Sequence, residues 1–250
     1  LNNNNEGIYL ARVSNGTIQN VTITANKIGI ILDDTRNIYL LNNTIDSNSG
    51  EGIVISYSEN VKVFRNWIFN NSLGGIVGDS SGDIDQNIIF DNRGSGITWS
   101  TFSNGPINIT NNTIYNNSMD GIVGEGMKFS LIMNNKIFEN RHGIHIESGI
   151  GIGSKSFNNT ILNNYISDNM EYGVYITIAS ENNLLYHNKF FNNNNGRKQA
   201  LDNGTSNRWN TSSEGNYWSD WRTPDNNSDG IVDFPYQLDG NSGAKDFYPL

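Results

Sequence analysis

The sequence predicts an all-β fold, a single-stranded parallel β-helix of about eight coils with a C-terminal cap. Three observations predict it: a glycine phrase that recurs at a regular interval, an asparagine phrase that recurs in step with it, and apolar residues that alternate along the chain. Repeats of about 20 to 50 residues are typical of solenoids, in which each coil buries its apolar side against its neighbours.

The glycine phrase is Gly, apolar, any residue, apolar, and its copies lie 21 to 30 residues apart. They begin at Gly7, Gly29, Gly52, Gly75, Gly96, Gly121, Gly143 and Gly173. The asparagine phrase begins at Asn43, Asn66, Asn87, Asn112, Asn135, Asn164 and Asn188, and it ends at Asn48, Asn71, Asn92, Asn117, Asn140, Asn169 and Asn193. Equivalent residues of successive coils stack, so we expect asparagine ladders whose amides donate and accept along the axis.

Within each unit the apolar residues alternate, as in Ile53 and Ile55, then Val61 and Val63, then Ile68. A period of two belongs to strands, so three short strands are expected in each unit. Asn, Ser and Gly separate the strands, and they tolerate the left-handed backbone of sharp corners. Stacked strands lie about 4.8 Å apart, so eight coils make a rod roughly 40 Å long.

The alternation also assigns faces to the first strand of each unit. The positions one and three after each Gly point inward, and the third-position column reads Leu10, Leu32, Ile55, Gly78, Trp99, Gly124, Ile146 and Ile176. Trp99 lies between two glycines in this column, so its ring is expected to fill the space that they leave. We therefore assign Trp99 to the core rather than to sugar stacking.

Composition limits the classes of partner. With 16 Lys and Arg against 25 Asp and Glu, the net charge is −9, and the chain lacks the positive surface that grips nucleic acid. The absence of Cys excludes disulfides and thiolate metal sites. The longest apolar runs, such as residues 28–32, are too short to cross a bilayer. Although 45 residues are Asn, Leu, Ile, Val and Phe together make up about a quarter of the chain, enough for a core.

The repeats end near residue 195, and the sequence divides there. Residues 1–195 are the predicted β-helix, and residues 196–250 hold three of the five Trp and three of the four Pro. The end of a β-helix is an open sheet edge that a solenoid covers with an atypical unit, so this segment is the predicted cap.

Coils of the form NNTIDSNSGEGIVISYSENVKVFRN, followed by GNYWSDWRTPDNNSDGIVDFPYQLDGNSGAKDFYPL, resemble the NosD-type and CASH-type right-handed β-helix repeats of secreted and cell-surface proteins, many of them archaeal. The resemblance covers essentially the whole chain, and residues 215–220 are its most particular part. It implies an extracellular or cell-surface β-helix whose leading partner is polysaccharide or cell-envelope glycan. It is specific for fold and weak for activity, because such repeats occur in hydrolases, epimerases, lyases, surface proteins and a periplasmic protein tied to copper maturation.

The outward column four residues after each Gly carries the candidate catalytic carboxylates. Glu125 and Glu147 occupy adjacent coils, about 5 Å apart, and Asp79 lies two coils from Glu125, about 10 Å away. These separations bracket those of retaining and inverting glycosidases, and paired carboxylates suit general acid catalysis. His145 and Tyr175 share the face and are also candidate catalytic residues, because such a pair could remove and return a sugar C5 proton, as lyases and epimerases of this architecture do.

Asp120, Arg141, His142 and Tyr172 lie nearby and are the candidate substrate-binding residues. The outward column beside the carboxylates is largely apolar, with Tyr9, Ile31, Val54, Val77, Val123 and Tyr175. An exposed apolar stripe needs a cover, a partner or a sugar. The competing interpretation is an ordinary solvated acidic surface.

The predicted cap contains a calcium-loop pattern, D-x-N-x-D-G-x-x-D, formed by Asp225, Asn227, Asp229, Gly230 and Asp233, with the carbonyl of Ile231 as a further ligand. Oxygen ligands at alternate positions around a Gly turn are typical of Ca²⁺ loops. Tyr236 stands where an EF-hand has its Glu, so the loop is not a complete EF-hand, and an Asx-rich turn without an ion is the alternative. Copper is disfavoured, because His142 and His145 are three apart on a strand and are expected to face differently.

The sequence therefore predicts an extracellular or cell-surface protein that engages polysaccharide on one face, with processing by a hydrolase, lyase or epimerase mechanism left open. A non-catalytic structural or adhesive envelope module, with self-association, is one alternative. A NosD-like copper-maturation protein is the other.

Overall fold

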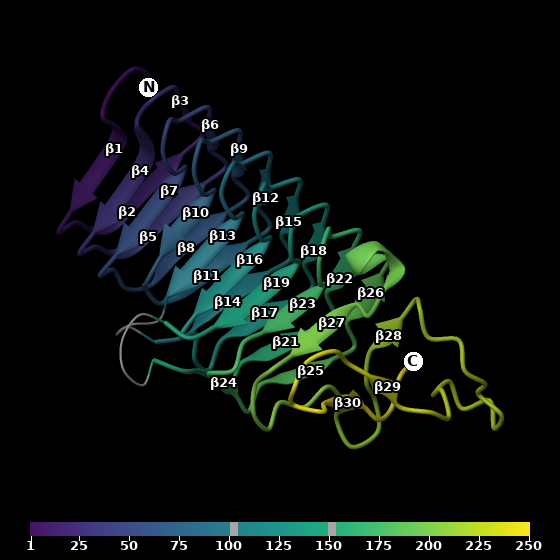
Figure 1. The fold of residues 1–250 in the computed structure, drawn as a ribbon. Helices are drawn as coiled ribbons and strands as arrows, with labels where there is room; N and C mark the ends of the chain where they lie inside the picture. The colour runs from purple at the N-terminus through teal and green to yellow at the C-terminus, as the bar shows by residue number, and fades with distance from the viewer. Residues whose placement is uncertain (101–104, 150–153) are drawn as a thin grey trace.

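Three long parallel sheets run the length of a rod in the computed structural model, which describes residues 1–100, 105–149 and 154–250 (Figure 1). Each coil contributes one short strand to each sheet, and each strand pairs with its equivalents in the coils before and after it. The structure is therefore a parallel β-helix, and the predicted fold class is confirmed.

Sheet A contains the first strand of each coil, and its nine strands are β1 (Glu6–Ala11), β4 (Ile28–Asp33), β7 (Ile53–Ser56), β10 (Ile76–Gly78), β13 (Ile97–Ser100), β16 (Ile122–Glu125), β19 (Ile144–Glu147), β23 (Val174–Ile176) and β27 (Ala200–Asp202). Sheet B contains the eight second strands, β2 (Ser14–Gln19), β5 (Arg36–Leu41), β8 (Val61–Phe64), β11 (Gly82–Asp85), β14 (Ile107–Thr110), β17 (Leu131–Met133), β21 (Thr160–Leu162) and β25 (Leu184–Tyr186).

Sheet C contains the nine third strands, β3 (Thr22–Thr24), β6 (Thr44–Asp46), β9 (Trp67–Phe69), β12 (Ile88–Phe90), β15 (Thr113–Tyr115), β18 (Lys136–Phe138), β22 (Tyr165–Ser167), β26 (Lys189–Phe191) and β28 (Tyr217–Trp218). The remaining elements are two small pairs, β20 (Ser156–Phe157) with β24 (Ser180–Glu181) and β29 (Tyr236–Gln237) with β30 (Lys245–Asp246), and the 3₁₀ segment η1 (Asn193–Gly196).

Two buried asparagine ladders hold the coils in register. In the ladder between sheets B and C, Asn87 Nδ2 donates to Asn112 Oδ1 at 3.0 Å, and Asn112 Nδ2 donates to Asn135 Oδ1 at 3.0 Å. Each amide oxygen also accepts the backbone N–H of the asparagine one coil earlier, and each Nδ2 also donates to a backbone carbonyl, as Asn112 does to Ile84. The side chains are thus fully satisfied in the interior, as a buried polar group must be.

The corners depend on left-handed backbone. In both ladders, from Asn43 to Asn193, the residue directly before each asparagine has a positive φ. Several of these preceding residues are themselves asparagines, but Arg65 (φ 55°) and Glu139 (φ 56°) are among them. A left-handed conformation is costly for most side chains, so the ladder behind it must hold the corner in place. The corners were expected to consist of Asn, Ser and Gly, but charged residues such as Arg65 and Glu139 also occupy them.

The repeated glycine is required by close approach rather than by φ. A Cβ atom on Gly121 would lie 2.6 Å from the carbonyl oxygen of Gly143 and 2.6 Å from Ile137 Cγ2. Real Cβ atoms do not approach other atoms so closely, so no larger residue fits this corner between sheets C and A. The glycine brings the coils together at or next to the start of each sheet A strand from β1 to β23.

Trp99 lies in the core as predicted, with 1% of its surface exposed. Its ring occupies the space above Gly78, where an added Cβ would lie 2.5 Å from Trp99 Cζ3, and its Nε1 donates to the carbonyl of Ser80 at 2.9 Å. On the other side the prediction is wrong in detail, because Met127 fills the space beside Gly124.

The C-terminal segment packs on the last coils. Trp218 lies between Phe190 and Tyr236, with ring centroids 4.3 and 4.0 Å apart, and all three side chains are buried. The buried Asp246 accepts hydrogen bonds from Asn216 and from Trp218 Nε1. The asparagine ladder between sheets B and C therefore ends on the carboxylate of Asp246. Burial raises the pKa of Asp246, although these hydrogen bonds oppose the shift.

The division at residue 195 stays a prediction. Sheets A and C extend past it through β27 and β28, while the rest of the C-terminal segment leaves the repeat (Figure 1). Among the described residues, no helix has the length and hydropathy to cross a bilayer.

Replacing Trp99 tests the register of the core. Trp99→Ala should lower the free energy of unfolding by about 3–5 kcal/mol, because it removes a buried ring next to a glycine that cannot fill the cavity. Urea denaturation measures the loss. Trp67→Ala is the matched control, since Trp67 is 52% exposed and should cost less than about 1 kcal/mol. Equal losses would contradict the register.

Candidate functional site

The outer face of sheet A carries two rows of side chains along the rod. The central row is in register from coil to coil and reads Tyr9, Ile31, Val54, Val77, Thr98, Val123, His145 and Tyr175. It is the predicted apolar column, it includes the ring pair of β19 and β23, and it continues to Leu201 of β27. The row beside it holds Glu125 and Glu147, which are register partners on adjacent strands.

Asp120 organises the polar groups next to the ring pair. It lies at the corner before β16 and is 1% exposed. Arg141, one coil later, donates to both of its carboxylate oxygens, with Nε 2.9 Å from Oδ1 and Nη2 2.8 Å from Oδ2. The backbone N–H of His142 and the Nδ1 atom of His145 complete its contacts, at 3.2 and 3.1 Å. One buried carboxylate thus positions three residues of the following coil.

Asp120 is held ionised. Burial by itself raises its pKa, but the hydrogen bonds from His145 and Arg141 and the positive charge of Arg141 outweigh burial, so the pKa lies well below the usual range for a carboxyl. The same contact raises the pKa of Arg141. The pair is therefore a fixed ionic unit.

His145 presents one nitrogen to the ionised Asp120 and the other to the row of carboxylates. Because Asp120 can only accept, Nδ1 carries a proton, and in the neutral ring Nε2 is the free acceptor. Nε2 is buried and has no hydrogen-bond partner among the described residues, and the nearest described carboxylate oxygen, Glu147 Oε2, is 3.8 Å away. The ring stacks on Tyr175, with centroids 4.7 Å apart and planes 13° apart. An orphaned buried nitrogen on a fixed ring is unusual in a folded chain and marks the place where a ligand hydroxyl group could bond.

Glu125 and Glu147 form the predicted carboxylate pair. Their strands are adjacent and in register, so their backbones are about 4.8 Å apart. Burial raises the pKa of Glu125, and the charge of Glu147 raises it further, while His145 opposes both effects. Asp79 is not part of this cluster, because its Oδ1 accepts the backbone N–H of Tyr57 at 2.8 Å and lies at the corner after β10.

His142 and Tyr172 are engaged in contacts that support the site. His142 Nδ1 accepts the backbone N–H of Tyr172 at 3.1 Å, and its Nε2 lies 3.2 Å from Glu171 Oε2. The Tyr172 hydroxyl donates to Asp239 of the C-terminal segment at 3.2 Å. Burial lowers the pKa of His142, and burial together with Asp239 raises the pKa of Tyr172.

The two histidines do not face differently, so that expectation is wrong. Their ring centroids are 5.7 Å apart. The alternation of a strand does not apply, because His142 precedes β19 and only His145 lies within it. Within residues 1–100, 105–149 and 154–250, no group of three His, Cys, Asp or Glu side chains is arranged to hold a metal ion.

The predicted calcium loop forms an exposed turn that bonds to itself. Asp225 accepts the backbone N–H groups of Asp229 and Gly230, and Asp229 accepts the N–H of Ile231 at 2.8 Å. Asn227 donates to Asp229. A further carboxylate of the pattern, Asp233, accepts from Asn226. The hydrogen bonds are those of an Asx-rich turn, and calcium at these residues stays a prediction.

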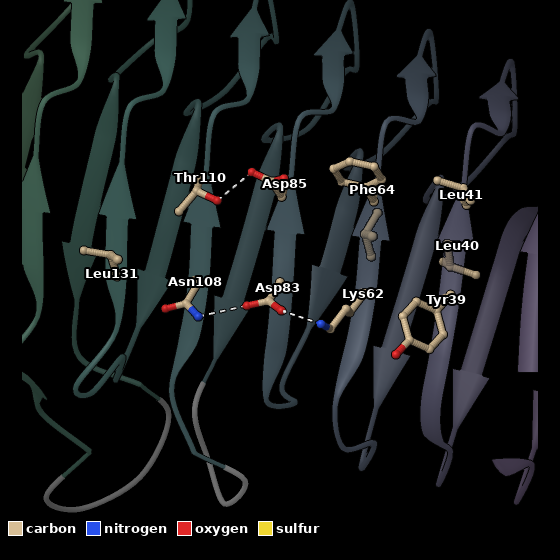
Figure 2. Close-up of a pocket in the computed structure, with 11 residues that line it drawn as sticks. Tyr39, Leu40, Leu41, Lys62, Phe64, Asp83, Asp85, Asn108, Thr110 and Leu131 are labelled. Atoms are coloured by element: carbon tan, nitrogen blue, oxygen red, sulfur yellow. Dashed lines mark hydrogen bonds and ion pairs between the residues drawn. The ribbon is translucent and has the colours of Figure 1, made fainter. Parts of the chain in front are cut away.

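The sequence-based prediction missed a groove on sheet B, which has a volume of about 590 Å³ (Figure 2). Its lining residues are Tyr39, Leu40, Leu41, Lys62, Val63, Phe64, Asp83, Asp85, Asn108, Thr110 and Leu131. The signal was present in the alternation of the second strand, since Lys62 and Phe64 both point outward from β8.

The prediction also missed a stack of rings outside sheet C. Phe69, Phe90, Tyr115 and Phe138 lie one above another with centroids 4.8 to 5.0 Å apart. The planes of neighbouring rings are within 8° of parallel, so neighbouring rings pack face to face and cover each other's faces. This stack stabilises the sheet and leaves only ring edges for a ligand.

A family model, a curated protein and several solved structures are similar to this chain. The family model described as the right handed beta helix region matches residues 1–107 and 78–217. The chain belongs to the right-handed β-helix family. An 83-residue stretch is 32% identical to the probable ABC transporter binding protein NosD of Stutzerimonas stutzeri, covering 33% of this chain and 18% of that protein. The predicted resemblance to NosD-type repeats is confirmed.

Solved structures share the β-helix fold at low identity. The mannuronan C-5 epimerase AlgE6 A-module of Azotobacter vinelandii has a TM-score of 0.66 at 18% identity, covering 82% of this chain and 58% of that one. The periplasmic alginate epimerase AlgG has a TM-score of 0.56 at 19% identity, covering 80% and 55%. DFA-IIIase of Arthrobacter chlorophenolicus A6, in complex with GF2, has a TM-score of 0.57 at 15% identity, covering 83% of this chain and 59% of that one. The β-helix described here therefore spans a little over half of these enzymes.

The buried His142 predicts a dependence of stability on pH. Its pKa is lower in the folded chain than the ordinary value of about 6.5, so the unfolded chain binds more protons below that pH. The free energy of unfolding should therefore fall as the pH drops from 7 to 5, by at most about 1.4 kcal/mol per pH unit from this group. Glu125 has a raised pKa, so above the ordinary glutamate pKa of about 4.3 its folded form binds more protons than its unfolded form. Its contribution to the free energy of unfolding therefore rises as the pH drops, opposite to that of His142. Urea denaturation at several pH values should show a smaller fall for His142→Gln than for the wild type, and equal slopes would refute this assignment.

Proposed function

We propose that this β-helix binds polysaccharide along the outer face of sheet A, outside the cytoplasm. The observation that carries the proposal is the fixed ring pair of His145 and Tyr175, with the unpartnered Nε2 atom of His145 beside the carboxylates of Glu125 and Glu147. Sugar hydroxyl groups are both donors and acceptors, and they suit a surface that offers a free acceptor nitrogen and carboxylate oxygens at one place.

The shape of the face supports a polymeric ligand. The row leads across six strands, from β1 to β16, to the ring pair, and most of its side chains are partly exposed. A row of aliphatic and aromatic groups beside a row of polar groups can contact the C–H surface and the hydroxyl groups of a sugar chain at the same time. The solved relatives in fold are named as a mannuronan C-5 epimerase, an alginate epimerase described as periplasmic, and a DFA-IIIase.

The charge of the cluster favours a neutral polysaccharide over a uronate polymer. Asp120, Glu125, Glu147 and Glu171 place carboxyl groups around the site, and the guanidinium of Arg141 is already bonded to both oxygens of Asp120. A uronate carboxylate would meet this charge, and the cluster's described residues offer no cation that is not already paired with a carboxylate. The proposed ligand therefore differs from the mannuronan and the alginate named for two of the structural relatives.

Hydrolysis of the bound chain is the second candidate function. Glu125 and Glu147 are register partners, and burial and the neighbouring charge raise the pKa of Glu125, as a general acid requires. Their strand spacing of about 4.8 Å is close to the separation of roughly 5 Å that retaining glycosidases use. In such a step Glu125 would protonate the glycosidic oxygen while Glu147 attacks the anomeric carbon, and water would then release the sugar from Glu147.

The other predicted functions have less support. Proton abstraction by His145 and Tyr175, as in a lyase or epimerase, needs a uronate substrate that the cluster's charge disfavours. A non-catalytic envelope module would use the same face without turnover. Calcium binding by Asp225 to Asp233 remains a proposal, for which calorimetric titration with Ca²⁺ and an Asp229→Asn variant is the test.

The binding test uses affinity electrophoresis with neutral β-glucans and mannans, with alginate as the acidic comparison. Tyr175→Ala and Glu147→Gln should each weaken binding of a neutral polymer by about tenfold, because each removes a group that faces the ligand. Tyr165→Ala is the matched control, since Tyr165 lies on the outer face of sheet C and should leave binding unchanged. Binding that is indifferent to both sheet A variants would contradict the proposal.

The same protein serves to separate binding from hydrolysis. Release of reducing ends from the bound polymer, lost in Glu125→Gln with binding retained, would establish hydrolysis. Binding without reducing ends in the wild type would establish the non-catalytic module.

A further inference from the structure

The groove on sheet B lies on a different face of the rod from the ring pair, and it is formed by two outward rows that run across β5, β8, β11 and β14. The first row is Tyr39, Lys62, Asp83 and Asn108, and the second is Leu41, Phe64, Asp85 and Thr110, each in register from strand to strand. Figure 2 shows both rows on the same face, with the rings at one end and the amide and hydroxyl groups at the other. Leu131 of β17 borders the far end.

The hollow arises from the sizes of these side chains. The lining combines the long side chains of Tyr39, Lys62 and Phe64 with the short side chains of Asp83 and Asp85, which are called the floor of the groove. The volume of about 590 Å³ lies within the range of roughly 300–1,000 Å³ that small-ligand sites occupy. An oligosaccharide-sized ligand fits such a groove better than a folded protein does.

The hydrogen bonds of the floor leave acceptors available. Asp83 is shared between Asn108 Nδ2, at 2.8 Å, and Lys62 Nζ, at 3.6 Å. Asp85 accepts only from neutral groups, Thr110 Oγ1 at 2.7 Å and the amides of Asn111 and Gln86. Its carboxylate charge therefore has no cationic partner among the described residues.

The charge selects the class of ligand. An anionic polymer would meet the unneutralised Asp85, whereas sugar hydroxyl groups donate to carboxylates and complement it. The ring of Tyr39 is 43% exposed, with Lys62 Nζ 5.9 Å from its centroid, and its exposed surface can take the C–H face of a sugar. Phe64 is held by Arg65, whose guanidinium carbon lies 4.5 Å from the ring centroid. Aromatic walls with a few fixed polar groups are typical of ligand sites.

We propose that the sheet B groove is a second carbohydrate site, which binds a neutral oligosaccharide between Tyr39, Phe64, Asp83 and Asp85. It shares no residue with the sheet A site, so the rod would hold glycan on two faces. Two sites on one rigid rod let it bridge two glycan chains or bind one chain with higher avidity.

The test is a titration with cellotriose, maltotriose and mannotriose, followed by saturation-transfer NMR. Tyr39→Ala and Asp85→Asn should each raise the dissociation constant of the trisaccharide that binds by about five- to tenfold, because one removes the stacking surface and the other the charged acceptor. Tyr165→Ala and Asp46→Asn, both on the outer face of sheet C, are the matched controls and should leave it unchanged. Circular dichroism and the melting temperature verify the fold of each variant.

Titrating the Tyr175→Ala variant separates this groove from the sheet A site. If trisaccharide binding persists in Tyr175→Ala and is weakened by about five- to tenfold when Asp85→Asn is added, the groove is a site of its own. Binding of no trisaccharide, or binding indifferent to Tyr39→Ala and Asp85→Asn, would overturn the proposal while leaving the sheet A proposal to its own test. A change of sedimentation in Tyr39→Ala without any trisaccharide binding would assign the groove to self-association and overturn it as well.

Discussion

The buried asparagine ladders are the constraint on which the rest of the molecule depends. An asparagine can satisfy all of its hydrogen bonds in this interior only when another asparagine, or a substitute acceptor such as Asp246, stands directly above it. A slip of one residue would leave several buried donors without partners and would turn the apolar side chains outward. The ladders therefore fix the register of every strand, and the register decides which side chains form rows on the outside.

A functional site on such a rod is assembled from neighbouring coils rather than from one segment. Asp120, Arg141 and Tyr175 come from three successive coils, yet two are directly bonded and the third stacks on the ring that Asp120 orients. The glycine corner contributes by bringing the coils to their closest approach next to this cluster. The same stacking produces the sheet B groove, where five strands each supply one or two outward side chains. The scaffold is uniform, and the chemistry depends on which residues occupy the outward positions.

The sequence was sufficient for what strand alternation and repeat spacing determine. The three sheets, both asparagine ladders, the core position of Trp99 and the pairing of Glu125 with Glu147 all follow from counting along the repeat. The sequence was insufficient to predict the contacts of residues that lie outside the strands. The ring of His142 turns toward His145 because it belongs to a corner, Met127 fills the space beside Gly124 from the turn after β16, and Tyr172 bonds to Asp239, 67 residues away. These contacts depend on corner geometry and on an irregular segment, neither of which a periodic pattern describes.

The most direct measurement compares two asparagines of one coil, four residues apart. Asn112 lies in the buried ladder, and its replacement by Ala removes the acceptor of the Asn87 backbone N–H, one acceptor of the Asn87 side chain and the side-chain donor to the carbonyl of Ile84. Asn108, by contrast, is exposed on β14. If the ladders fix the register, urea denaturation should show a loss of about 3–5 kcal/mol for Asn112→Ala and less than about 1 kcal/mol for Asn108→Ala. Equal losses would contradict the account, because the fold would then depend on its apolar core without the ladders.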